Sequence, residues 1–257
     1  MPGCSKAKNP RGIEIIFTEE DHKYKSIINN KEIEYISGTQ FLGKYYPKFD
    51  PTGEIAKRCA LKAGITVEKI KKQWSDKGIE SCRLGTRTHE LCEDIILGNK
   101  IRNIAESDVE ERRFKNASAL AYKLKHSIDI LGVEKIVFSD RLSPKIAGTI
   151  DLFGKSRKTG EYLILDWKTN AEITQDNIYN KFCLNSINHI PDTNFHHYSL
   201  QLSLYQFLLK FEEYVPKNAI FKRALLHVTE NHAKIIQCPD YTNEIKDMII
   251  EYNCNLN

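Results

Sequence analysis

Residues 145–169 read KIAGTIDLFGKSRKTGEYLILDWKT, and this stretch decides the fold. It contains two apolar segments, 145–154 and 161–169, separated by the turn sequence Lys158-Thr159-Gly160. Short apolar runs bounded by turn residues are typical of buried β-strands. The stretch therefore predicts a β-hairpin in the interior of an α/β protein.

Each strand of this predicted hairpin carries one carboxylate, Asp151 in the first and Asp166 in the second. A charge in a buried strand is costly without a partner, because it loses its hydration. Pairing the strands would bring the two carboxylates together, where they repel each other unless a cation lies between them. Carboxylate oxygens suit Mg²⁺ and Mn²⁺, so the pair predicts a divalent metal site.

Lys168 follows Asp166 by two residues, so both side chains lie on the same face of the strand. An ammonium group beside a metal and two acids can orient a water molecule or offset charge on a phosphate, as in metal-assisted phosphodiester hydrolysis. A buried salt bridge explains an isolated Asp-x-Lys pattern more readily than catalysis does. Other motifs are needed to choose between the two interpretations.

Around the hairpin, the sequence predicts alternating strands and helices in one domain. Asn29-Asn30 predicts a turn between strands within residues 13–36, and Ser37-Gly38-Thr39 predicts a helix start. Further strands are expected at 133–140, 219–229 and 233–238. Helices are expected within 53–80 and at 79–97, 107–131, 195–211 and the C-terminal end, with a long loop at 171–194 that either caps a site or is a surface insertion. The expected organisation is a flexible tail (1–12), an N-terminal β-hairpin and helical elaboration (13–80) and a core (81–257).

The composition of the 257 residues is that of an ordinary globular protein, with 41 % hydrophobic and 28 % charged residues. A net charge of +4 excludes a histone-like polycation. Residues 1–80 hold 15 Lys and Arg against 11 Asp and Glu, interleaved with aromatic residues. This pattern favours DNA contact by Lys44–Lys48 and Lys57–Lys77, although a solvated helix face explains each single residue equally well.

The seven cysteines are scattered and odd in number, which indicates free thiols in a reducing compartment. No apolar run approaches the roughly 18 residues of a membrane span, and the N-terminus lacks the apolar segment of a secretory signal. We therefore expect an intracellular protein without a membrane partner, in the cytoplasm or an organellar matrix.

Two further motifs lie on predicted helices. Gly85 and His89 form a GxxxH pattern, and Glu93 shares the face of His89 one turn later. Gln201 and Tyr205 form a QxxxY pattern on the face of another helix. The ordered set GxxxH, GTID, LDWKT and QxxxY resembles the RecB-like branch of the PD-(D/E)XK nuclease superfamily, over roughly residues 84–210. The early segments ISGT (36–39) and YYPKF (45–49) also resemble phage-type and mitochondrial genome maintenance exonucleases.

This resemblance implies a restriction-endonuclease-like core, a central mixed sheet flanked by helices. It implies that Asp151 and Asp166 are catalytic metal ligands and that Lys168 positions and activates the attacking water. It also implies two further metal ligands, His89 and the main-chain carbonyl of Trp167. The supporting or DNA-binding residues would be Arg87, Glu93, Thr169, Tyr198, Gln201, Tyr205, Ser37, Thr39 and Lys48.

The function expected from the resemblance is a Mg²⁺- or Mn²⁺-dependent DNA exonuclease. It would act on single strands or free ends in replication, recombination or repair, beside other proteins of those processes. A structure-specific or restriction-type endonuclease on the same core and a non-catalytic DNA-binding module remain alternatives.

Other cofactors are not expected. The chain has no phosphate-binding GK[ST] loop, so a nucleotide cofactor is not expected. The C-terminal part offers only Cys238 and Cys254, without the close spacing of an iron–sulfur site. His196 and His197 point about 100° apart on a helix, which favours a surface or DNA-facing role over a metal pair.

Overall fold

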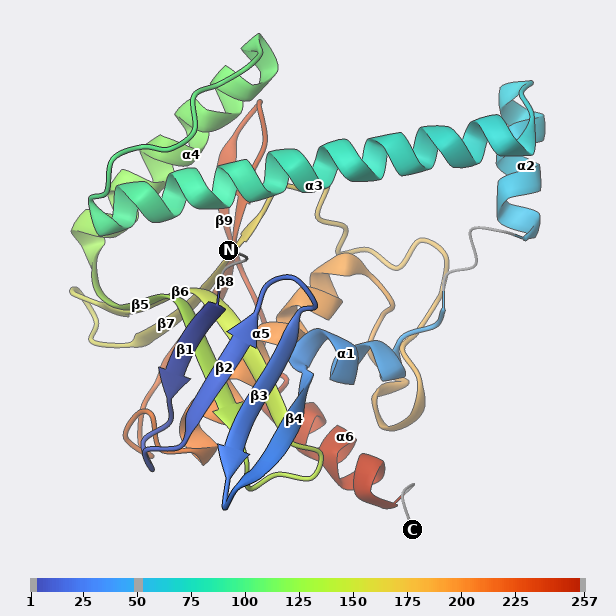
Figure 1. The fold of residues 1–257 in the computed structure, drawn as a ribbon. Coiled ribbons are helices and arrows are strands. Elements are labelled where there is room, and N and C mark those ends of the chain that lie inside the picture. The colour runs from blue at the N-terminus through green and yellow to red at the C-terminus, as the bar shows by residue number, and fades with distance from the viewer. Residues whose placement is uncertain (1–3, 49–52, 255–257) are drawn as a thin grey trace.

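A mixed sheet of nine strands organises residues 4–48 and 53–254, the part of the chain that this computed structural model describes (Figure 1). The strand order is β1-β2-β3-β4-β6-β7-β8-β9, and β5 pairs with β6 beside this path. The strands are β1 (Cys4–Lys8), β2 (Glu14–Thr18), β3 (Lys23–Ile28), β4 (Lys31–Ser37), β5 (Ile128–Ser139), β6 (Ile146–Ser156), β7 (Tyr162–Lys168), β8 (Phe221–Val228) and β9 (Ala233–Gln237).

Six α-helices and two short 3₁₀ turns accompany the sheet in the described residues. They are α1 (Gly38–Leu42), η1 (Gly43–Tyr45), α2 (Glu54–Ala63), α3 (Val67–Leu97), α4 (Asp108–Ser127), η2 (Asn185–Ile187), α5 (Asn194–Phe211) and α6 (Thr242–Cys254). The α/β architecture with a mixed sheet flanked by helices is confirmed. Among the helices of the described residues, none is both long enough and apolar enough to cross a bilayer.

The predicted hairpin is β6 and β7, and it is confirmed. The two strands pair antiparallel from Lys155 opposite Tyr162 to Leu152 opposite Leu165. β5 pairs with one edge of β6 along the length of the strand. β4 and β7 pair with the opposite edge of β6. β4 reaches only the first two residues of β6, which leaves residues 148–151 without a partner strand on that edge. The sheet is therefore open at Asp151.

Helices cover the two faces of the sheet with separate apolar cores. Leu165 and Trp167 of β7 pack against Leu91 of α3 and Phe114 of α4 on one face. Ile164 of β7 belongs to the core on the opposite face, formed mainly with residues of α1, α5 and α6. Alternate residues of a strand point to opposite faces, so Asp166 and Lys168 follow Ile164 toward α5.

The N-terminal tail prediction is wrong for residues 4–12. Residues 4–8 form β1, which pairs antiparallel with β2 and extends the sheet by one strand. Asn9 then holds the turn, because its side-chain oxygen accepts bonds from the amides of Arg11 and Ile13. An edge strand of polar residues has little apolar pattern, which is why the sequence did not indicate it.

Two helix boundaries also differ from the prediction. α3 runs unbroken from Val67 to Leu97, where a new helix was expected near Ile79. α4 ends at Ser127 rather than near Leu131, because residues 128–132 pair with the last residues of β6. The predicted helix end at residue 97 and the turn at Asn29-Asn30 are confirmed. Gly98, which follows that helix end, and both asparagines have positive φ.

The first half of α3 carries α2 and projects beyond the sheet (Figure 1). Ala56 and Ala60 of α2 pack on Ile70 of α3, with Trp74 at the edge of this small apolar cluster. We call α2 and residues 67–80 of α3 the helical arm. Its lysines are exposed: Lys57, Lys62, Lys69, Lys71, Lys72 and Lys77.

Candidate active site

Asp151 lies where β6 and β7 separate. Its Oδ2 accepts a hydrogen bond of 2.8 Å from the main-chain amide of Trp167. The N–H and C=O of one residue in an extended strand point to the same edge, so the Trp167 carbonyl also faces the gap. The structure thus brings the Asp151 carboxylate and the Trp167 carbonyl to one opening in the sheet.

Asp166 and Lys168 form an ion pair beside this opening. Asp166 is buried, with 3 % of its surface exposed, and the side chain of Lys168 is 17 % exposed. The Lys168 ammonium lies 4.6 Å from the centre of the Tyr198 ring, a cation–π contact with α5. The Tyr198 hydroxyl donates to the Asn170 side chain at 3.0 Å, which fixes the ring over the lysine.

The pKa values of Asp166 and Lys168 depend on their burial and on the nearby charge of Asp151. Burial raises the pKa of Asp166, an effect that Lys168 opposes and Asp151 strengthens. Burial alone would lower the pKa of Lys168, but the charges of Asp166 and Asp151 outweigh it and raise this pKa. Lys168 is therefore a cation at neutral pH. Its single positive charge only partly neutralises the carboxylates of Asp166 and Asp151.

α3 supplies His89 to the same opening. His89 Nδ1 lies 3.6 Å from Asp151 Oδ2. One turn earlier, Gly85 packs against the end of β7, where a Cβ atom would lie 3.2 Å from the Thr169 hydroxyl. The glycine of the GxxxH pattern thus lets α3 approach β7 closely enough for His89 to reach Asp151.

Glu134 is a member of the site that the sequence analysis missed. Its ligand atoms and those of His89 and Asp151 all lie within 4.8 Å of one another. Glu134 has a positive φ of 47° in β5, in a strand that also contains a bulge. Desolvation of the carboxyl and the charge of Asp151 raise the pKa of Glu134 to about 8, although the residue as a whole is solvent-exposed.

The register of the β5–β6 hairpin contains the signal for Glu134. Ser139 pairs with Ile146 and Lys135 with Ile150, so the next position of β5 lies beside Asp151. Counting back from the turn at residues 140–145 would have identified this carboxylate. Glu134 lies outside the β6–β7 hairpin, so the acids of that hairpin alone did not indicate it.

A cleft of about 890 Å³ lies between the N-terminal strands and α3, and His89 and Glu134 are among the residues that line it. One stripe of α3 lines it from the helical arm to the site, with residues spaced by four: Lys77, Ser81, Gly85, His89 and Glu93. Phe17 and His22 line the opposite side, with ring centres 5.4 Å apart. The cleft thus extends from the helical arm to His89 and Glu134, with two aromatic rings on its opposite side.

Gln201 and Tyr205 lie beneath β6 and support it. The Gln201 side-chain amide donates to the Tyr205 hydroxyl at 3.0 Å, and Tyr205 is buried. A Cβ atom on Gly148 would lie 2.4 Å from Tyr205 Cε1, so the ring occupies the space that the glycine leaves. This pair supports residues 148–151 of β6, which lack a partner strand on the edge that faces β7.

Arg87 forms hydrogen bonds within the protein, and its predicted DNA contact stays a prediction. Its Nε donates to Glu110 and its terminal nitrogen to the Ile104 carbonyl, both at 2.6 Å. Glu93 accepts a bond of 2.7 Å from Arg102 in the lining of the cleft, and its predicted supporting role stays a prediction.

The three predicted residues near α1 lie outside the cleft lining. Ser37 is the N-cap of α1 and forms a capping box with Gln40. The Thr39 hydroxyl lies 3.1 Å from that of Ser37, and Lys48 is exposed beyond η1. A DNA contact by these residues stays a prediction.

No protein-family model matches this sequence, and a search of curated proteins finds no match either.

Proposed function

We propose that this protein is a divalent-metal-dependent phosphodiester hydrolase that acts on DNA, with a PD-(D/E)XK-type core. The supporting observation is the convergence of Asp151, Asp166 and Lys168 from the β6–β7 hairpin with His89 from α3. A structural salt bridge explains Asp166 and Lys168 alone. It does not explain why His89 and Glu134, which line a cleft, also lie close to Asp151.

The donor set fits Mg²⁺ or Mn²⁺. Glu134 and Asp151 offer hard carboxylate oxygens within 4.8 Å of a His89 ring nitrogen. The Asp166 carboxylate, on which the charges of Asp151 and His89 act, and the Trp167 carbonyl would complete the set. Burial and the charge of Asp151 raise the pKa values of Glu134 and Asp166, and a bound cation would lower them. A divalent ion at this place supplies Lewis-acid activation of a phosphate and of the attacking water.

Lys168 would bind and orient the reacting groups. Because its pKa is raised, it acts as a hydrogen-bond donor and a fixed positive charge rather than as a proton acceptor. Asp166 and the Tyr198 ring hold the ammonium in place before substrate arrives. Preorganised charge of this kind stabilises the negative charge that develops on a phosphate in the transition state.

The cleft favours a single strand or a frayed end as the substrate. Phe17 and His22 offer aromatic rings against which unpaired bases can pack, and Lys77 offers a charge for a phosphate. The exposed lysines of the helical arm add positive charge farther from the site. We therefore propose an exonuclease that engages DNA in replication, recombination or repair.

The test is digestion of single- and double-stranded DNA, labelled at either end, with Mg²⁺, Mn²⁺ or a chelator. We expect metal-dependent, stepwise shortening of linear DNA and intact covalently closed circles. Cleavage of the circles would instead identify an endonuclease. Binding without any metal-dependent product would identify a non-catalytic DNA-binding module and overturn the proposal.

A further inference from the structure

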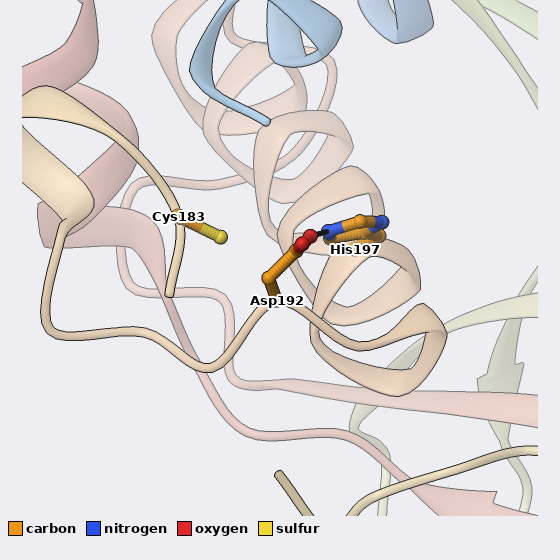
Figure 2. A group of neighbouring side chains, drawn as sticks. All are labelled: Cys183, Asp192 and His197. Atoms are coloured by element: carbon orange, nitrogen blue, oxygen red, sulfur yellow. Dashed lines mark hydrogen bonds and ion pairs between the residues drawn. The ribbon is translucent and has the colours of Figure 1, made fainter. Parts of the chain in front are cut away.

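A second group of potential metal ligands lies on the loop between β7 and α5. Cys183 and Asp192 belong to this loop, and His197 belongs to the first turn of α5 (Figure 2). The sulfur of Cys183, a carboxylate oxygen of Asp192 and a ring nitrogen of His197 all lie within 4.8 Å of one another. None of the three belongs to the candidate active site.

The loop is built to present two of these side chains together. Phe182 and Pro191 form an isolated antiparallel bridge. On either side of it, the Cys183 amide donates to Ile190 and the Asp192 amide to Lys181, both at 2.9 Å. A small hairpin thus holds Cys183 and Asp192 on neighbouring strands, facing α5.

The three ligand atoms converge on one point. Asp192 Oδ1 lies 2.8 Å from His197 Nε2, and Figure 2 shows the Cys183 sulfur on the same side of the imidazole ring. A Cys-His-Asp catalytic triad needs the two ring nitrogens for two different partners. Here the same ring nitrogen, Nε2 of His197, faces both Asp192 and Cys183, which is the arrangement that a shared cation requires.

Unpartnered hydroxyl groups provide an independent indication of a missing ligand. The Tyr46 ring stacks on His197 with ring centres 3.7 Å apart, and its hydroxyl is buried without a hydrogen-bond partner among the described residues. Thr193 Oγ1, next to Asp192, is also buried and unpartnered. Buried polar groups are rarely left unpaired, and a bound ion with its water would supply partners.

We propose that Cys183, Asp192 and His197 bind a structural Zn²⁺ ion, with water beside the Tyr46 hydroxyl in the fourth position. Thiolate, imidazole and carboxylate are the three side-chain ligand types of zinc, at about 2.0–2.3 Å from the ion. Zinc binds cysteine as the thiolate, so zinc binding would release a proton from Cys183.

The site would fix the loop near the active site without taking part in catalysis. The residue after His197 is Tyr198, whose ring covers the Lys168 ammonium. Zinc would hold the loop hairpin against the start of α5, and so restrict the segment of α5 that carries Tyr198. This inference does not depend on the proposed nuclease activity.

The test is titration of the metal-free full-length protein with Co²⁺. A thiolate ligand gives a sulfur-to-cobalt absorption band in the near ultraviolet, which a carboxylate site such as that of Asp151 does not give. We expect the band in the wild type and in Cys238→Ser, which removes another buried cysteine, and its loss in Cys183→Ser and His197→Ala. Absence of the band from the wild type, or its persistence in Cys183→Ser, would overturn the proposal.

A second measurement covers variants that fold poorly. A chelator selective for zinc over magnesium should lower the melting temperature of the zinc-loaded wild type and leave that of Cys183→Ser unchanged. The bound zinc, measured by elemental analysis, should fall to background in Cys183→Ser and stay stoichiometric in Asp151→Asn. Equal zinc content in the wild type and Cys183→Ser would show that the ion lies elsewhere.

Discussion

The main-chain amide of Trp167 donates a 2.8 Å hydrogen bond to the Asp151 carboxylate, across the gap where β6 and β7 separate. This bond holds Asp151 in position without help from a metal ion. It also means that an amide side chain at residue 151 can keep the same acceptor while losing the charge. The role of the charge can therefore be tested apart from the role of the contact.

Asp151→Asn should lower the rate of metal-dependent DNA cleavage by about 10³-fold, because metal-ion stabilisation of several kcal/mol corresponds to roughly three factors of ten. The unfolding temperature of the metal-free protein should not fall, since the variant removes repulsion from Glu134 and Asp166. Single-turnover cleavage and thermal unfolding measure the two effects. Asp129→Asn changes an exposed acid of β5 paired with Arg157 and should cleave at the wild-type rate. Equal rates for both variants would contradict the assignment.

Tyr198→Leu should lower the cleavage rate by about 5- to 30-fold, because a desolvated cation–π contact contributes roughly 1–2 kcal/mol to holding the lysine. Tyr198→Phe keeps the ring over Lys168 and loses only the bond to Asn170, so its loss should be smaller. The effect should appear in kcat, with little change in DNA affinity. A reduction in affinity at unchanged kcat would mean that Tyr198 binds DNA directly.

Glu134→Gln should change how stability depends on pH. The pKa of Glu134 is about 8 in the folded protein against an ordinary 4.5, so between these values the folded state holds more protons than the unfolded state. Stability of the metal-free wild type therefore falls as pH rises through this window, and Glu134→Gln removes that fall. The melting-temperature advantage of the variant should grow from about pH 5 to about pH 8.

Two controls define this pH experiment. Glu172→Gln alters an exposed carboxylate of the loop after β7 and should show no advantage that grows with pH. Saturating Mg²⁺ should stabilise the wild type more than Glu134→Gln, because the cation supplies the missing positive charge. A constant difference across the pH range would mean that Glu134 is solvated like any surface acid.

Gly148→Ala and Gly78→Ala should have opposite effects on stability. A Cβ atom at residue 148 would lie 2.4 Å from Tyr205 Cε1, so the ring must move, at a cost of about 1–3 kcal/mol. Gly78 lies within α3 and a Cβ there would contact nothing within 4 Å, so alanine should stabilise by about 0.5–1 kcal/mol. Urea unfolding measures both. A neutral Gly148→Ala would show that Tyr205 does not brace β6.

The hairpin could be predicted because its evidence is local. Apolar runs, a Lys-Thr-Gly turn and acids at fixed positions specify β6 and β7 from short windows of sequence. Bringing His89 to Asp151 needed the resemblance to a nuclease pattern, since 62 positions separate them and no local rule joins a helix face to a strand. That convergence is present in the structure, and the activity it suggests stays a prediction.

The remaining differences have tertiary causes. The sequence of Ile128 and its neighbours fits either a helix or a strand. These residues form a strand because they pair with the last residues of β6. Gly78 indicates a helix break, yet packing of α2 on Ile70 helps the first half of α3 to stay helical. Glu134 required the register of a second hairpin and a positive φ that sequence patterns do not reveal.

Because α3 is unbroken, the direction in which the side chains of its first half point is fixed relative to the direction of His89. Because each helical residue advances by about 100°, one alanine inserted after Gly78 would turn Lys77 out of the stripe that lines the cleft. Seven inserted residues, about two turns, would nearly restore that direction and move the arm outward by about 10 Å. A DNA strand bound along α3, as proposed, would thus meet charged side chains in helical register with His89, and the length of this helix would set where on the strand the proposed cleavage occurs.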